Sequence, residues 1–373
     1  MNERIAKLRQ QSLDAVPTIS PERAELMTRF YEEELGPASS PVERAMAFHY
    51  LLANKAIYLG DGELIVGEKG PAPKATPTYP ELCCHSLQDL DILNGREKIP
   101  FQVCSITRSV YEQTIIPVWR GNAMRDLILR EMTAEWHQAY DAGVFTEFME
   151  QRSPGHTTLD DKIYKKGMLD FKQEIENALA ALDFINDPEA YEKQEQLRAM
   201  DTTADALILF ANRHADRAEE LAAVEKDPTH RAELKQIAAV CRRVPAHAPR
   251  TFWEALQYYW FVHLGVTMEL NPWDAFNPGR LDQHLEPFYT RELAGGTLTR
   301  EEAEELLHCF WIKFNNQPAP PKVGVTAAES STYTDFAQIN TGGVKEDGSD
   351  AVNEVTYLLL DVIEEMRLLQ PSS

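Results

Sequence analysis

Apolar residues recur at helical spacing over long stretches of this chain. A stripe at positions i, i+3, i+4 and i+7 is typical of a helix that buries one side. The three clearest stripes are Ala303, Leu306, Leu307, Phe310 and Phe314; Met200, Ala204, Leu207, Ala211, Ala218 and Leu221; and Val352, Val355, Leu359, Val362, Met366 and Leu369. We therefore expect a fold made mostly of packed helices, the last of which runs to about Leu369.

Signals for the start of a helix support this expectation. Ser20-Pro21 and Ser40-Pro41 each offer an N-cap residue followed by proline in the first turn. Thr251 with Glu254, and Thr299 with Glu302, fit the capping box, in which each side chain satisfies a backbone N–H at the helix start. Helices are thus predicted to begin at four defined places.

Three segments between the helices have a different composition. Residues 57–70 contain an apolar run between glycines, which predicts a short strand. Residues 71–80 hold four prolines and are predicted to be loop. Residues 315–343 are long for a plain connection and retain apolar side chains, so we expect an ordered, functional segment there.

Composition limits the class of protein. The 373 residues include 43% hydrophobic residues, which is ordinary for a globular chain, and no repeat or Gly/Ser linker divides them. The net charge of −22 disfavours binding to nucleic acid or to anionic membranes. The charged start of the sequence lacks the apolar core of a secretory signal, so we expect a cytoplasmic protein in one compact unit.

Five cysteines are too few and too scattered for a disulfide scaffold. Cys83-Cys84-His85 resembles a metal cluster, but adjacent cysteines rarely bind one tetrahedral ion and no second pair completes the ligand set. We therefore favour a structural role for this tripeptide. The phosphate-binding, zinc-protease and esterase motifs are missing from the sequence.

Three places could carry chemistry, although the residues alone leave each one open. His156 follows a Ser-Pro-Gly turn and could be a catalyst or a satisfied hydrogen-bonding residue. Asp274 lies among large apolar residues and could be a helix cap or a site acid. The hydroxyl-rich run 330–336 could be a solvated turn or a nest that holds a small carboxylate.

Several segments resemble the glycyl radical enzymes, the superfamily that includes pyruvate formate-lyase. They are Asp61-Gly-Glu-Leu-Ile-Val-Gly-Glu68, Pro117-Val-Trp-Arg-Gly121 and Pro154-Gly-His156. Longer segments resemble the trans-4-hydroxy-L-proline dehydratase subfamily most closely. They are residues 77–85, 145–157, 269–276, 314–324 and 329–336, and the likeness extends over essentially the whole chain.

The resemblance implies an α/β fold, a ten-stranded barrel built as two half-barrels and wrapped in helices. Residues 1–373 would be a partial pyruvate formate-lyase-type domain, the helix-rich N-terminal part with a half-barrel. The chain has no Gly-Cys-Val-Glu loop and no Arg-Val-x-Gly loop, and none of its cysteines matches the family's radical cysteine. We expect the C-terminal half to be absent and the fragment to be inactive alone.

The resemblance also implies chemistry. A radical SAM activase would install a glycyl radical in the missing half, and the enzyme would remove water from hydroxyproline to give 1-pyrroline-5-carboxylate. The catalytic positions that match are His156 and Asp274. The substrate-binding positions that match are Phe148, Ser330, Asp335 and Phe336. No metal is implied, no cofactor would be bound by this half, and a homodimer is expected.

Two other functions compete with this interpretation. The chain could come from another glycyl radical lyase or dehydratase, of the diol or choline type or resembling formate acetyltransferase. It could also be a naturally short, non-catalytic helical scaffold derived from the family. A truncated half-barrel would expose strand edges and apolar faces, so poor solubility of the fragment would disfavour the scaffold.

Overall fold

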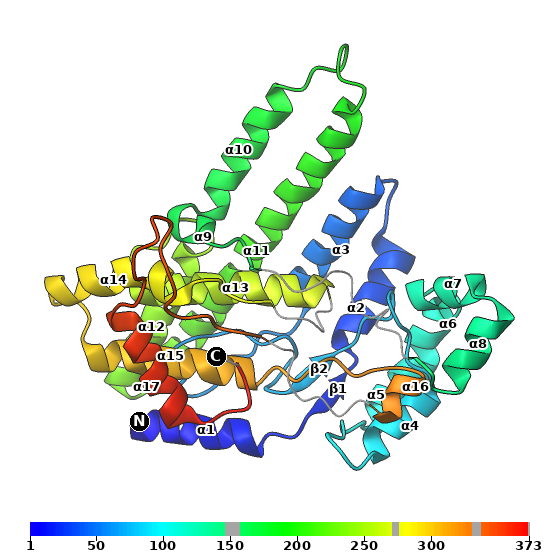
Figure 1. Ribbon diagram of the computed structural model, residues 1–373, viewed down its shortest axis with the longest axis horizontal. Helices are drawn as coiled ribbons and strands as arrows, with labels where there is room; N and C mark the ends of the chain where they lie inside the picture. Colours follow the sequence, from blue (N-terminus) through cyan, green and yellow to red (C-terminus); the bar gives the residue numbers. More distant parts are fainter. Residues whose placement is uncertain (146–156, 271–275, 330–336, 372–373) are drawn as a thin grey trace.

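The structure, a computed structural model, describes residues 1–145, 157–270, 276–329 and 337–371. Helices dominate these ranges (Figure 1). The α-helices are α1 (Glu3–Asp14), α2 (Glu22–Arg29), α3 (Ser40–Asn54), α4 (Leu87–Gly95), α5 (Ser105–Val110), α6 (Ile116–Trp119), α7 (Met124–Glu131), α8 (Ala134–Asp141), α9 (Lys162–Lys165), α10 (Met168–Ala180), α11 (Ala190–Val224), α12 (Pro228–Arg243), α13 (Phe252–Leu270), α14 (Leu281–Gly295), α15 (Arg300–Asn315), α16 (Val325–Glu329) and α17 (Glu354–Met366). Two π-helical turns, η1 (Phe30–Glu34) and η2 (Tyr111–Ile115), extend α2 and α5.

The long helix α11 packs against α3, α10 and α12, and the α10–α11 hairpin projects from the body (Figure 1). Its inner stripe is rich in alanine: Ala204, Ala211, Ala215 and Ala218 are each at most 5% exposed. These low exposures show that most of the predicted stripe lies on the buried face of α11. Because alanine side chains are small, the neighbouring helices can approach α11 closely. Met200, which the periodicity placed on that face, is 55% exposed.

Helix α13 passes through the centre of the main core and is buried on almost all sides. Helices α11, α12, α14 and α15 pack against it. Phe310 and Phe314 of α15 meet Trp260 of α13 edge to face. A smaller apolar cluster lies among α4, η2 and α6, around Leu90, Phe101 and Tyr111. Burial of these aromatic faces is the main stabilising contribution.

The sheet in the described residues consists of two short parallel strands, β1 (Thr18–Ser20) and β2 (Ala75–Pro77). The prediction of a strand within 57–70 was wrong, and so was the prediction that 71–80 is only loop, because β2 lies inside it. Residues 63–70 are buried, and no strand among the described residues pairs with them. Side chains bind their carbonyl groups instead: Trp253 Nε1 donates to Leu64 O at 2.9 Å and Trp260 Nε1 donates to Gly67 O at 2.9 Å.

The predicted helix starts are found at or next to the expected residues. Thr299 and Glu302 form a complete capping box at α15. Thr251 Oγ1 accepts from Glu254 N at 3.1 Å, while Glu254 binds Arg250 N rather than closing the box. The last helix ends at Met366, before the predicted Leu369, because Arg367 adopts a left-handed conformation with φ of 46°.

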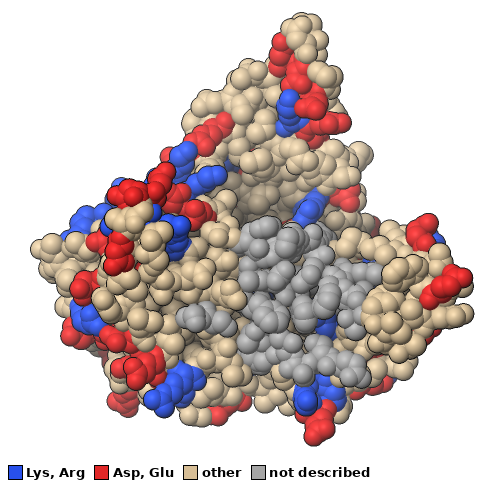
Figure 2. All heavy atoms as spheres, viewed as in Figure 1, with Lys and Arg blue, Asp and Glu red and all other residues tan. Residues whose placement is uncertain are grey.

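Charged side chains of both signs are interspersed on the face shown in Figure 2. Basic groups on this face are mixed with acidic ones rather than gathered in a patch. Among the described helices, none is long and apolar enough to cross a membrane.

Candidate functional site

All six residues that the resemblance assigns to the site lie outside the described residues. They fall in three ranges: Phe148 and His156 in 146–156, Asp274 in 271–275, and Ser330, Asp335 and Phe336 in 330–336. The described residues on either side of each range show where the chain enters and leaves it.

The residues that follow the first and second ranges are paired. Thr157 and Asn277 form a parallel bridge, in which Thr158 N donates to Asn277 O at 3.0 Å. Glycine at position 279 permits this close approach, because a Cβ there would lie 2.8 Å from Thr157 Cγ2. The φ of Gly279 is 70°, a left-handed conformation that also favours glycine. The chain therefore leaves both ranges side by side.

The residues that follow 330–336 pack against the chain that follows 271–275. Arg280 and Asn340 form a second parallel bridge. Asp282, fully buried at the start of α14, accepts hydrogen bonds from Gly342 N at 2.6 Å and from Thr356 Oγ1 at 2.5 Å. One carboxylate thus fixes the segment after 330–336 to both α14 and α17.

Helix α16 leads directly into the third range and is held by α4. Asp89 Oδ1 accepts from Gly324 N at 3.0 Å, just before α16. Arg96 Nη1 donates to Ala327 O at 2.9 Å. The prediction that 315–343 is ordered is confirmed for its described part.

A groove of about 910 Å³ lies between α3, α10, α11 and α13. Its lining includes Leu270, the last described residue before 271–275, and Leu159, and most of the other lining residues are apolar. Arg44 and Glu269, on its polar edge, already pair with each other at 2.5 Å. A zwitterionic amino acid needs charged partners on both of its ends, and this lining does not offer a free pair.

A buried ionic cluster lies where α15 ends. Lys313 Nζ contacts Glu63 Oε1 at 2.6 Å and Glu68 Oε1 at 3.0 Å, and both its side chain and that of Glu68 are 1% exposed. Asn316 Nδ2 donates to Glu68 Oε1 at 2.9 Å, and Gln317 also donates to this carboxylate. The cluster ties the buried 63–70 segment to the chain that runs toward α16.

Electrostatics favour a charged lysine in this cluster. Burial lowers the pKa of Lys313, but the two carboxylates outweigh burial and raise it. Burial raises the pKa of Glu68, an effect that nearby Glu63 strengthens and Lys313 opposes. No role was predicted for Lys313, Glu63 or Glu68, although the last two lie in the family motif 61–68. A signal was present, since Lys313 interrupts the apolar run Phe310–Phe314, and Glu63 and Glu68 enclose Leu64-Ile65-Val66.

Cys83-Cys84-His85 is part of the packed interior. Burial raises the pKa of the Cys84 thiol to about 12, and burial lowers the pKa of His85. Protonated thiols are poor metal ligands. Within the described ranges, no group of histidine, cysteine and acidic side chains has the arrangement of a metal site.

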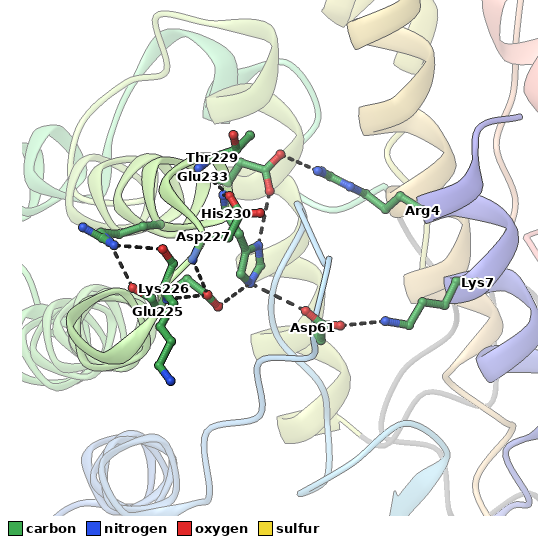
Figure 3. A network of polar contacts seen from close by, with 10 residues as sticks. Arg4, Lys7, Asp61, Glu225, Lys226, Asp227, Thr229, His230 and Glu233 are labelled. Carbon is green, nitrogen blue, oxygen red and sulfur yellow. Dashed lines mark hydrogen bonds and ion pairs between the residues drawn. The ribbon is translucent and has the colours of Figure 1, made fainter.

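A separate polar network joins α1, residue 61 and α12 (Figure 3). Lys7 Nζ contacts Asp61 Oδ2 at 2.6 Å, and His230 lies 3.6 Å from Asp61 and 3.4 Å from Glu233. Arg4 pairs directly with Glu233, and both residues line a cavity of about 270 Å³. Partly exposed pairs of this kind each contribute at most about 1 kcal/mol to stability. We interpret the network as a surface connection between helices.

Comparison with known proteins places this framework in a family. The pyruvate formate lyase-like family matches residues 1–373. A trans-4-hydroxy-L-proline dehydratase of Clostridioides difficile is 54% identical over 371 residues, which cover 100% of this chain and 47% of that relative. An isethionate sulfite-lyase of Nitratidesulfovibrio vulgaris is 31% identical over 383 residues, which cover 99% of this chain and 46% of the relative. The chain thus spans about half the length of these relatives.

Solved structures agree with the sequence matches. The structure of hydroxyproline dehydratase from Clostridioides difficile, with trans-4-hydroxy-L-proline bound, superposes with a TM-score of 0.96 at 54% identity and covers 100% of this chain and 47% of that one. A structure of a Roseburia inulinivorans protein that concerns 1,2-propanediol dehydration gives a TM-score of 0.91 at 30% identity, covering 100% of this chain and 44% of that one. The predicted helix-rich part of the glycyl radical enzyme fold is confirmed, and the chain belongs to the pyruvate formate lyase-like family.

Proposed function

We propose that this chain is the N-terminal half of a glycyl radical dehydratase that converts trans-4-hydroxy-L-proline to 1-pyrroline-5-carboxylate and water. One observation carries the proposal. Identity to the hydroxyproline dehydratase is 54% over the whole chain, whereas identity to the isethionate sulfite-lyases is 29–31% over a similar length. A difference of this size favours the substrate class of the more similar relative.

The substrate makes distinct demands on this half of the enzyme. Hydroxyproline is a zwitterion, so its carboxylate needs hydrogen-bond donors and its ammonium needs a counter-charge. We assign the carboxylate to Ser330 and the ammonium to Asp335, and we place the ring between Phe148 and Phe336. Loss of the C4 hydroxyl as water needs a proton at that oxygen, which we assign to His156, with Asp274 in the same polar network.

The radical chemistry belongs to the other half of the proposed enzyme. A protein-derived glycyl radical, installed by a radical SAM activase, would supply hydrogen-atom abstraction from the substrate. The present chain would bind, orient and exclude water from the reacting ring. A cytoplasmic homodimer that lacks bound metal in this half completes the proposal.

The test begins with the coding DNA beyond Ser373. If the reading frame continues into a Gly-Cys-Val-Glu loop and a late Arg-Val-x-Gly loop, the full-length protein is produced with its activase under anaerobic conditions. Formation of 1-pyrroline-5-carboxylate from hydroxyproline is the expected result, with no product from the 373-residue chain alone. Turnover by the isolated chain would contradict its assignment as an inactive half.

Substrate selectivity is tested in the same preparation. Isethionate and 1,2-propanediol are supplied separately at the same concentration as hydroxyproline. Preference for either one would replace hydroxyproline by another substrate of the superfamily. A frame that stops at Ser373, with no neighbouring gene for the second half, would favour the helical scaffold instead.

A further inference from the structure

Two of the ranges that hold predicted site residues start from the same small region of the structure. Phe145 is the last described residue before 146–156, and Glu329, at the end of α16, is the last before 330–336. These residues are far apart in sequence. Both starting points depend on one side chain of α8, Tyr140, which is 6% exposed.

The hydroxyl of Tyr140 holds the start of α16. It accepts a hydrogen bond from Val325 N at 3.2 Å, and Val325 is the first residue of that helix. It also accepts from Arg125 Nη2 at 2.7 Å, so that the guanidinium lies beside the same hydroxyl. An N–H at the first turn of a helix has no partner within the helix, and this hydroxyl supplies one.

Close packing leaves little freedom at this contact. Gly324 has a φ of 59°, and a Cβ on it would lie 2.5 Å from both Tyr140 Oη and Arg125 Nη2. On the other side, Asp89 Oδ1 accepts from Gly324 N at 3.0 Å. The backbone that leads into α16 is therefore enclosed between α4 and α8.

The ring of Tyr140 holds the other starting point. Its centroid lies 5.9 Å from that of Phe145, and Trp136, one turn earlier in α8, meets Phe145 edge to face at 5.1 Å. Aromatic contacts at these separations are stabilising beyond their buried area. The chain thus enters 146–156 from a position set by α8.

We propose that Tyr140 is a positioning residue for substrate binding, which acts by fixing Phe145 and the start of α16, the described parts of the chain that lead into residues 146–156 and 330–336. This inference rests on the proposed function, because these segments carry the groups assigned to the ring, the carboxylate and the ammonium of hydroxyproline. Loss of the hydroxyl removes the partner of Val325 N and should let the start of α16 shift relative to α8. The substrate would then meet its partners with poorer geometry while the helical core stays intact.

The test uses radical-free, full-length protein, in which binding is measured without turnover. Isothermal titration calorimetry gives the Kd of trans-4-hydroxy-L-proline for the wild type and for Tyr140→Phe, which keeps the ring. Loss of the hydroxyl contacts should raise the Kd about tenfold, which corresponds to roughly one hydrogen bond. In the activated enzyme, KM should rise more than kcat falls.

The matched control is Tyr111→Phe. Tyr111 is fully buried in the second core and its hydroxyl bonds to Thr78, so this variant also removes a buried hydroxyl contact. It should lower the Tm in the same way as Tyr140→Phe but leave the Kd within twofold of the wild type. A Tyr140→Phe protein with wild-type Kd, or an equal rise in Kd for Tyr111→Phe, would overturn the inference. Failure of the wild type to bind hydroxyproline would instead reject the proposed function on which it rests.

Discussion

The side-chain amide of Gln257 pairs with the main chain of Val66 as a neighbouring strand would. Its Nε2 donates to Val66 O at 2.9 Å, and its Oε1 accepts from Val66 N at 2.9 Å. Gln257 is 1% exposed and lies in the middle of α13. A helix therefore supplies the hydrogen bonds that the buried segment 63–70 would otherwise lack.

Replacement of Gln257 by leucine should be strongly destabilising. The leucine fills a similar volume but leaves the N–H and C=O of Val66 unsatisfied in the core. Each unsatisfied buried group costs about 1–3 kcal/mol, so we expect the free energy of unfolding to fall by about 2–6 kcal/mol in urea titrations. The control Gln173→Leu, on the exposed face of α10, should change it by less than about 0.5 kcal/mol. Similar effects of the two changes would show that the pairing is unimportant.

Gly324→Ala tests the close approach between α16 and α8. Both Gly324 and Gly296 have left-handed backbone conformations, with φ of 59° and 66°, but a Cβ at Gly296 would meet no atom within 4 Å. Gly296→Ala should therefore cost only the conformational penalty of about 1 kcal/mol. Gly324→Ala should cost about 1–3 kcal/mol more, because Tyr140 Oη cannot move without its ring. Equal losses of unfolding free energy would mean that the surrounding helices relax freely.

The buried cluster around Lys313 should be intolerant of losing its lysine. Lys313→Met leaves Glu63 and Glu68 without their cation, and removing one partner of a buried pair costs about 3–5 kcal/mol. Lys7→Met removes the exposed pair with Asp61 and should cost less than about 1 kcal/mol. Adding Glu68→Gln to Lys313→Met should restore part of the lost stability in urea unfolding. Failure of this second change to help would place the destabilisation in packing rather than in charge.

Buried histidines should make the protein sensitive to acid. Burial lowers the pKa of both His214 and His263 to about 3, whereas an unfolded histidine titrates near pH 6.5. The unfolded state binds protons first as the pH falls below about 6.5, so stability is complete above that value and decreases toward pH 3. Between pH 7 and pH 5, each of the two histidines should lower the free energy of unfolding by about 2 kcal/mol.

His214→Gln isolates one of these contributions. The variant should lose about 2 kcal/mol less than the wild type between pH 7 and pH 5 in urea unfolding. Between pH 8 and pH 7 the unfolding free energies of the two proteins should change almost in parallel, because the histidine takes up few protons there in either the folded or the unfolded state. If the difference in unfolding free energy between the variant and the wild type stays the same from pH 7 to pH 5, His214 takes up its proton in the folded protein as it does in the unfolded one.

Helix positions could be predicted from the sequence because their signals are local. The capping box of Thr299 and Glu302 and the buried stripe of α15 depend on residues within a few turns of one another. The predicted strand in 57–70 failed for the opposite reason. Its apolar run indicates burial, but whether the backbone pairs with a strand or with Gln257, Trp253 and Trp260 depends on α13, which lies about 190 residues further along the chain.

Family membership could also be read from contiguous motifs, and the comparisons confirmed it. The assignment of His156, Asp274, Ser330 and the other site residues stays a prediction, since these residues lie outside the described ranges. The described residues that flank them are held by contacts that could not be predicted from any sequence pattern. Three examples join distant parts of the chain. Thr157 forms a bridge with Asn277. Asp282 accepts hydrogen bonds from both Gly342 and Thr356, and Tyr140 accepts one from Val325. Local propensities and capping act over a few residues, whereas these contacts exist only after the helices have packed.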